Sequence, residues 1–314
     1  MSIFTVIFMY AAWSSVFSFG KAALEHCPPV FLTGFRMTFA GIILLIWLGI
    51  KNIKSLKIGK KQLLPLIALA VFSIYLTNIL EFWGLQYLTA AKACFIYSLS
   101  PFFAALFSYI HFGEKMNKKK LFGMLIGCLG FIPALMSQSS SGGFSFSISW
   151  PDIALMGAAL FSVYGWVLLR VIVKNQTLSP LYANGYSMLF GGILAFIQSA
   201  FVDTWAPIPV TTQLPAVIKS IIIMTAISNI LCYNLYGFML KKYTATFLSF
   251  MGLLSPIFAS LNSWAILGES PSWYILVSTS IVSLGLFIVY QAELKQGYIA
   301  KSAPTPSSDA ASAT

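Results

Sequence analysis

Three polar side chains stand three residues apart within an apolar stretch: Tyr75, Asn78 and Glu81. Residues at this spacing share one face of an α-helix, so we predict a polar stripe along it. A carboxylate inside an apolar helix is costly unless it faces a cavity or a partner, and Glu81 is the acidic residue well inside such a stretch. It could bind a cationic ligand, carry a proton, or pair with Arg36 or Lys92. The residue types alone leave all three open.

A second stripe at helical spacing occurs later in the chain, at Asn229, Tyr233 and Tyr236. Asn-Ile-Leu immediately precedes Glu81 and also precedes Cys232, which aligns the carboxylate with a thiol. The Asn-Ile-Leu segment is therefore repeated, and the negative charge of Glu81 is not. This favours a ligand-binding role for Glu81, although divergence of the two stripes would also erase their symmetry.

Aromatic side chains make up 16% of the chain, and many of them are expected to face lipid or the membrane interface. Some lie deep enough in predicted helices to contact a flat ligand by stacking or a cation by its charge, with plain packing as the alternative. These are Trp13, Tyr97, Tyr164 and Trp166. Together with Glu81 they would form a box for an aromatic or cationic ligand.

The chain carries no recognisable catalytic motif. Its two histidines, His26 and His111, lie near predicted helix ends, and its four cysteines form no Cys-x-x-Cys pair. No HExxH, no GxSxG, no glycine-rich phosphate loop and no ATP-binding domain is present. We therefore predict no catalytic residues, no metal site, no cofactor and no enzyme activity. Any movement of a solute must be driven by a gradient or by exchange.

The elements that position these residues are predicted to be membrane-spanning helices. The chain is 58% hydrophobic and 9% charged, which is too apolar for a soluble protein of this length. A span needs about 20 apolar residues, and continuous apolar runs favour helices over strands. Ten segments qualify: 3–20, 30–50, 63–86, 93–113, 119–137, 151–173, 180–202, 214–239, 244–267 and 273–292. This predicts an all-α membrane protein.

The net charge of +11 is explained by topology and does not point to a nucleic-acid partner. Most of the 19 basic residues lie in alternate loops between the predicted spans. By the positive-inside rule, these loops and both termini are cytoplasmic. The predicted location is the bacterial inner membrane, with the lipid bilayer as the surrounding partner.

Residues 88–114 and 243–269 are two copies of one segment. Each contains Thr-Ala, then Leu-Ser-Pro, then Gly-Glu at the same intervals. Their prolines, Pro101 and Pro256, each remove a backbone donor and are expected to bend a helix, as a static kink or as a hinge. The duplication predicts two related halves.

The predicted halves each hold five helices. Residues 1–137 form the first and residues 150–292 the second. An odd number of spans makes the second half enter the membrane upside down, which gives two inverted five-helix repeats. Residues 138–149, rich in serine and glycine, are predicted to be a flexible linker, and residues 293–314 a disordered tail.

The doubled Thr-Ala, Leu-Ser-Pro, Gly-Glu pattern resembles the drug/metabolite transporter superfamily, EamA-type branch. Further matches are Trp13, Lys21, Pro29, Arg36, Tyr164, Arg170 and Pro180. The resemblance covers residues 3–292, with Ser14 replacing a glycine that is common after the tryptophan. It implies a ten-helix carrier with a central cavity lined by helices 1, 3, 4, 6, 8 and 9.

The resemblance also implies roles for three charged residues. Arg36 matches a position typical of the family, which favours a structural or gating role, with contact to a substrate carboxylate as the alternative. Glu114 and Glu269 end the two repeated segments and are interpreted as structural.

The resemblance implies a secondary transporter of a small organic molecule that works by alternating access without an ATPase subunit. One EamA-type branch, from host-dependent bacteria, is similarly lysine-rich and acid-poor; it takes up S-adenosylmethionine and returns S-adenosylhomocysteine. We expect that exchange first. Proton-coupled export of aromatic amino acids is the alternative, with other metabolites or drugs, a non-transporting sensor and a lipid-moving protein behind it. The oligomeric state is not predicted.

Overall fold

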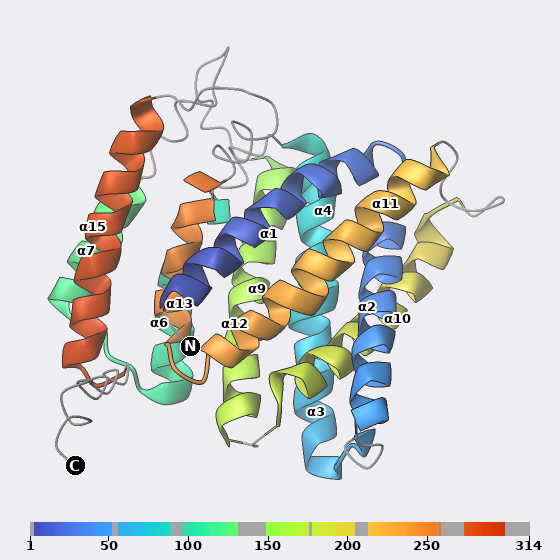
Figure 1. Cartoon of the computed structure of the whole chain (residues 1–314), viewed down its shortest axis with the longest axis horizontal. Coiled ribbons are helices and arrows are strands. Elements are labelled where there is room, and N and C mark those ends of the chain that lie inside the picture. The colour runs from blue at the N-terminus through green and yellow to red at the C-terminus, as the bar shows by residue number, and fades with distance from the viewer. Residues whose placement is uncertain are drawn as a thin grey trace, which may run out of the picture.

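The computed structural model describes residues 3–51, 56–88, 96–97, 99–130, 149–175, 178–204, 213–255, 257–258 and 273–298. Every regular element in these ranges is helical, which confirms the all-α prediction. Figure 1 shows long helices that run between two ends of the molecule. By length and composition, five of the described helical stretches can cross a membrane: Pro29–Lys51, Lys60–Tyr87, Trp150–Lys174, Pro180–Val202 and Leu214–Met239.

The first five predicted spans all contain helix. They are α1 (Ile3–Leu24), α2 (Pro29–Lys51), a continuous stretch of α3 (Lys60–Leu69), η2 (Ala70–Leu76) and α4 (Thr77–Tyr87), then α6 (Ser100–Phe112) and α7 (Lys118–Gly130). The η2 segment is a π-helix, which is a wider turn than the α-helix on either side.

The last five predicted spans also contain helix. They are α9 (Trp150–Asn175), α10 (Pro180–Val202), a stretch of α11 (Leu214–Met224), η3 (Thr225–Cys232) and α12 (Tyr233–Met239), then α13 (Ala245–Met251) with the short η4 (Gly252–Leu254), and α15 (Trp273–Lys295). The η3 segment is a second π-helix. Because α15 ends at Lys295, its last three residues fall within the predicted tail, residues 293–314.

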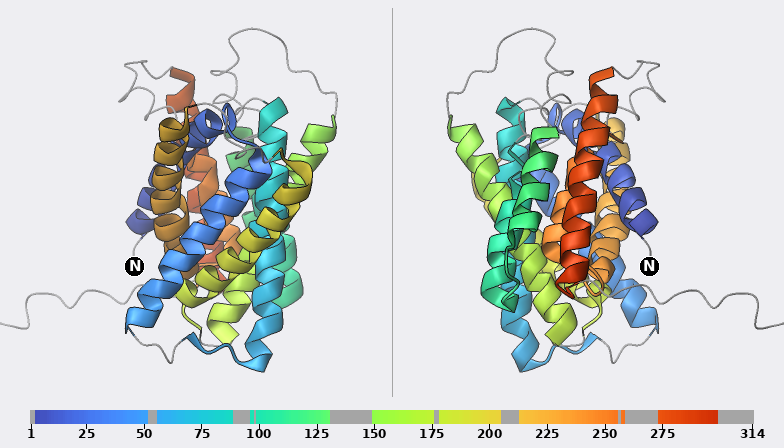
Figure 2. Two further views of the ribbon diagram at one scale, coloured as in Figure 1. Left: turned by 90° about the vertical axis from the view of Figure 1, so that its right-hand side faces the viewer. Right: turned by 90° about the vertical axis from the view of Figure 1, so that its left-hand side faces the viewer.

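Small residues let helices from the two halves approach closely. A Cβ atom on Gly41 of α2 would lie 2.5 Å from the backbone nitrogen of Leu189 in α10, and one on Gly192 would lie 2.4 Å from that of Thr38. The same packing joins α7 to α15, where a Cβ on Gly285 would meet the carbonyl oxygen of Gly123 at 2.7 Å. Figures 1 and 2 show these two pairs at opposite edges of the molecule. Backbone contact of this kind is typical of helices packed within a membrane.

The contacts between elements follow the same pattern in both halves. The η2–α4 stretch packs on α9, and the η3–α11 stretch packs on α1, so the third helix of each half contacts the first helix of the other. The π-helices begin at Ala70 and Thr225, which are as far apart in sequence as Ser100 and Ser255 of the repeated segment. Aligning the two halves by this interval places Glu81 opposite Tyr236, whereas the repeated Asn-Ile-Leu placed Glu81 opposite Cys232.

The basic ends of several helices lie together. The last turns of α2, α9 and α15 carry Lys51, Lys174 and Lys295, while α3 begins at Lys60 and α7 at Lys118. All five of these helix ends lie at the lower end of Figure 1. The helices therefore bring basic residues from alternate loops of the sequence to one end of the molecule.

Candidate functional site

A cavity of about 190 Å³ lies between helices of both halves. Its walls come from α1, α2, α4, α6, α9, α11, η3, α12, α13 and η4, with Tyr97 between α4 and α6. Arg36 and Glu81 are the charged side chains among the described residues that line it. Most of the remaining wall is aromatic or carries a hydroxyl group.

Arg36 enters the cavity from α2, the helix held by the glycine contact with α10. The side chain is 3% exposed. Its Nη2 donates a hydrogen bond of 2.6 Å to Oδ1 of Asn78, and its guanidinium carbon lies 4.9 Å from the centre of the Phe82 ring. Asn78 is held in turn because its Nδ2 donates to the carbonyl oxygen of Ile74 at 2.8 Å. A positive charge is thus fixed at one wall.

Glu81 enters the cavity from α4, one helical turn after Asn78. The hydroxyl group of Tyr97 donates a hydrogen bond of 2.7 Å to its Oε2. The Glu81 carboxylate also lies within electrostatic range of the Arg36 guanidinium. One of the three roles that the sequence left open was an ion pair of Glu81 with Arg36 or Lys92. Lys92 lies outside the described residues, and within them no direct ion pair joins Glu81 to Arg36.

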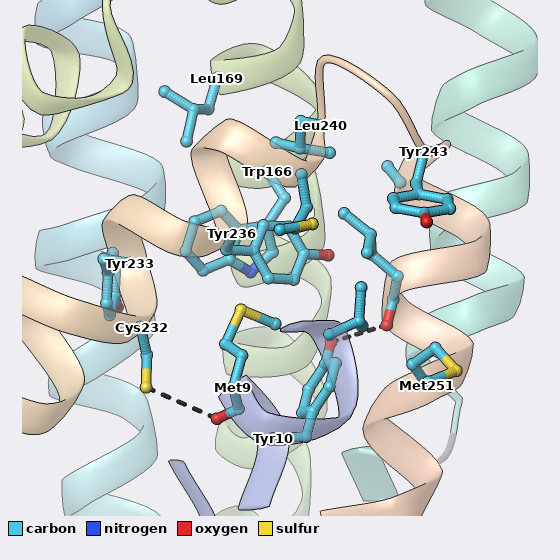
Figure 3. Packing of buried hydrophobic residues seen from close by; sticks show 14 of the residues in the cluster. Met9, Tyr10, Trp166, Leu169, Cys232, Tyr233, Tyr236, Leu240, Tyr243 and Met251 are labelled. Atoms are coloured by element: carbon cyan, nitrogen blue, oxygen red, sulfur yellow. Dashed lines mark hydrogen bonds between the residues drawn. The ribbon is translucent and has the colours of Figure 1, made fainter. Parts of the chain in front are cut away.

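Five aromatic residues form one wall, which we call the aromatic cluster: Tyr10, Trp13, Trp166, Tyr233 and Tyr236. The rings of Trp166 and Tyr236 stack with their centres 4.1 Å apart, as Figure 3 shows, and Tyr233 lies 5.0 Å from Trp166. Trp13 is 5.4 Å from Tyr233 and is the partly buried member, whereas the other four are buried. Flat π-faces at the wall of a cavity suit a planar ligand.

Sequence reasoning did not identify every residue of the wall. Tyr10 stacks on Trp13, and its hydroxyl donates to the carbonyl oxygen of Leu248 at 2.6 Å, drawn as a dashed line in Figure 3. Ser100 and Ser255, which occupy equivalent places in the repeated segment, both line the cavity. The repeated Leu-Ser-Pro in the sequence was the signal that could have identified Ser100 and Ser255 as wall residues.

Three predicted site residues lie outside the cavity wall. The hydroxyl of Tyr75 donates to Oε1 of Gln198 at 3.0 Å, and Nδ2 of Asn229 lies 2.9 Å from the sulfur of Met37. Both lie within π-helices, whose wider turns displace the faces that α-helical spacing predicts. Tyr164 packs on Phe72 with ring centres 5.1 Å apart; it stands two residues before Trp166, so the two cannot share a helix face.

The structure describes parts of both copies of the repeated segment, residues 96–97 and 99–114 of the first and 243–255 of the second among them. Pro101 stands in the first turn of α6, where a helix needs no backbone donor, so it does not interrupt the hydrogen bonds of α6. Gly113 caps the other end with φ of 65°, and Oε1 of Glu114, which follows it, lies 2.6 Å from Nη2 of Arg170. Pro256 and Glu269 of the second copy lie outside the described residues.

The described residues show no group of three or more His, Cys, Asp or Glu that could hold a metal ion. Cys27, Cys128 and Cys232 lie in different elements or connections. Burial, with a smaller effect of nearby Asp203, raises the pKa of the Cys27 thiol between α1 and α2 to about 12.

The chain shares its sequence pattern with a known family. A model of the EamA-like transporter family matches residues 1–136 and again residues 149–291. The chain belongs to this family. An EamA-like transporter is a multi-pass membrane protein, and the described helices are apolar enough for that.

Similar proteins cover nearly the whole EamA-like chain. An S-adenosylmethionine/S-adenosylhomocysteine transporter of Chlamydia trachomatis serovar L2 is 37% identical over 95% of this chain and 92% of its own. A transporter of the same description from Chlamydia muridarum is 37% identical over 96% and 95%. An uncharacterized transporter of Bacillus subtilis, YyaM, is 25% identical over 87% and 88%.

A solved crystal structure has the same fold. It superposes with a TM-score of 0.73, covering 93% of this chain and 96% of its own, at 16% sequence identity. At that identity the likeness concerns the fold alone.

Proposed function

We propose that this protein is a secondary carrier that takes up S-adenosylmethionine and returns S-adenosylhomocysteine. The observation that carries the proposal is a cavity that joins the Glu81 carboxylate to the aromatic cluster, in a chain 37% identical over 95% of its length to transporters of that description. Proteins this similar over their full length usually keep one fold, and the cavity chemistry decides whether they keep one ligand.

The chemistry of the two ligands fits the cavity walls. Both contain an adenine ring, which suits the faces of Trp13, Trp166 and Tyr233, and both carry an ammonium group. S-adenosylmethionine also carries a sulfonium group, and its positive charge suits Glu81 and the surrounding π-faces. The hydroxyl groups of Ser100 and Ser255 can bind ribose oxygens.

The proposed transport mechanism is alternating access between two inverted halves, residues 1–137 and 150–292. The repeated π-helices and the matching contacts of η2–α4 and η3–α11 support a symmetric exchange of conformations around the cavity. The grouping of basic helix ends supports an inner-membrane protein with both termini in the cytoplasm.

Thermal unfolding of the purified protein with a panel of metabolites tests the proposal. A ligand at one hundred times its dissociation constant stabilises the folded state by about 2.7 kcal/mol. We expect stabilisation by S-adenosylmethionine and S-adenosylhomocysteine but not by aromatic amino acids or nucleosides at the same concentration. Stabilisation by aromatic amino acids alone would replace the proposal with amino-acid export.

A further inference from the structure

We propose that Arg36 binds the carboxylate of the ligand's amino-acid part and so selects intact amino-acid ligands over analogues that lack this group. The inference rests on the proposed function and adds a specificity-determining residue to it. Arg36 lies on α2 and lines the same cavity as the aromatic cluster that is assigned to adenine.

The hydrogen bonding of the Arg36 side chain is incomplete within the described residues. The side chain is 3% exposed and lines the cavity. Nη2 donates to Asn78, a neutral amide, and Nε has no hydrogen-bond partner among the described residues. A buried guanidinium is costly unless its charge is compensated and its donors are used. A ligand carboxylate would supply both the opposite charge and the acceptor oxygens, in the forked geometry that arginine prefers.

The other deeply buried arginine, Arg170, has a different partner from Arg36. Arg170 is 2% exposed and lies outside the cavity wall, and its Nη2 is 2.6 Å from Oε1 of Glu114. Arg170 therefore has a carboxylate partner within the protein. Arg36 is equally buried and lines the cavity, but its Nη2 donates to a neutral amide in place of a carboxylate. Both guanidinium groups also lie over an aromatic ring, Phe82 for Arg36 and Phe112 for Arg170.

Arg36 and Glu81 place opposite charges on the wall of one cavity. The Glu81 carboxylate, held by Tyr97, lies within electrostatic range of Arg36 on a neighbouring helix. A zwitterionic amino-acid group has its carboxylate and ammonium close together and can lie between these two residues. Both proposed ligands carry this group unchanged, so Arg36 would serve each direction of the exchange.

The test compares two ligands that differ in this carboxylate alone, S-adenosylmethionine and its decarboxylated analogue, by titration calorimetry on the purified full chain. We expect the wild type to prefer S-adenosylmethionine by roughly tenfold or more, as a charged hydrogen bond allows. In Arg36→Gln the preference should vanish, because affinity for S-adenosylmethionine falls while that for the analogue is little changed. An equal loss for both ligands would overturn the inference and leave Arg36 a structural residue.

Arg36→Lys provides a second test if Arg36→Gln does not fold. It keeps the charge and loses the fork, so we expect a reduced but measurable preference for the carboxylate; an unchanged preference would overturn the forked contact. Arg170→Lys is the matched control, since it changes an arginine of equal burial outside the cavity and should leave the preference as in the wild type. A wild type that binds neither ligand overturns the proposed function and this inference with it.

Discussion

The hydroxyl group of Tyr97, which precedes α6 in the chain, donates a hydrogen bond of 2.7 Å to Oε2 of Glu81 on α4. This bond fixes the orientation of the carboxylate at the cavity wall. Glu81 is partly buried, so its carboxylate is reachable from the cavity while one oxygen is held in place. A pre-oriented charge of this kind binds a cation without first ordering its own side chain.

Glu81→Gln should weaken binding of S-adenosylmethionine more than binding of S-adenosylhomocysteine. The first ligand carries an additional positive charge, and the substitution removes the negative charge that faces it. We expect a loss of roughly tenfold for S-adenosylmethionine, the size of one charge-assisted contact, and a smaller loss for S-adenosylhomocysteine. Titration calorimetry with both ligands measures the difference. Equal affinities to those of the wild type would remove Glu81 from the binding site.

Tyr97→Phe should have the same direction of effect and a smaller size. The ring remains and the hydrogen bond to Glu81 is lost, which costs about 1 kcal/mol and corresponds to roughly a fivefold loss of affinity. In the Glu81→Gln background the substitution should have almost no further effect, because the two residues act as one unit. The double mutant shows whether this is so; additive losses would mean that Tyr97 contacts the ligand by itself.

Trp13→Leu should weaken both adenosyl ligands by the same factor. Adenine is common to them, and Trp13 is the partly buried member of the aromatic cluster. The lost stacking is worth about 1 kcal/mol, or roughly a fivefold change in each affinity. Trp83→Leu is the control, since Trp83 lies on α4 with 37% exposure and outside the cavity wall. A loss confined to one ligand would contradict the assignment of the cluster to adenine.

Lys120→Met should strongly destabilise the fold. Nζ of Lys120 lies 2.6 Å from Oε1 of Glu293, and both side chains are at most 2% exposed, so the substitution leaves a buried carboxylate without its partner charge. The expected cost is about 3–5 kcal/mol. Adding Glu293→Leu should recover part of it. Thermal unfolding in detergent measures the change, with exposed Lys119→Met as the control; a mild effect of Lys120→Met would show that the pair is not needed.

Gly192→Ala should loosen the packing of α2 on α10. Its Cβ would lie 2.4 Å from the backbone nitrogen of Thr38, so one helix must move. Gly157→Ala is the matched control, because its Cβ would meet only a side-chain atom of Leu80 at 3.3 Å. We expect a clearly lower unfolding temperature for the first and a small change for the second. Equal unfolding temperatures would contradict the close approach of the two helices.

The fold could be predicted from the sequence because membrane spans leave a direct signal in hydropathy. Each predicted span contains helix in the structure, with ends that differ by a few residues at α1, α3 and α15. The place of Pro101 in the first turn of α6 was not predicted, since proline is compatible with a bend or with a first turn.

The cavity was only partly predictable. Polar or aromatic residues at helical spacing share one helix face, and seven of the predicted site residues do line the cavity: Glu81, Asn78, Trp13, Tyr97, Trp166, Tyr233 and Tyr236. Tyr75 and Asn229 do not line the cavity, because they lie in the π-helices Ala70–Leu76 and Thr225–Cys232. The composition of these segments does not predict a π-helix. The side-chain partner of Arg36 also depends on how α2 and α4 pack, which one sequence does not contain.

Exchange in proteoliposomes tests the central claim most directly. Vesicles that contain the purified protein and S-adenosylhomocysteine are placed in radiolabelled S-adenosylmethionine, beside vesicles filled with buffer or with phenylalanine. We predict rapid uptake of label that depends on internal S-adenosylhomocysteine and falls sharply in the Glu81→Gln protein. Uptake no greater than in vesicles without protein, or uptake unaffected by what the vesicles contain, would contradict the exchange.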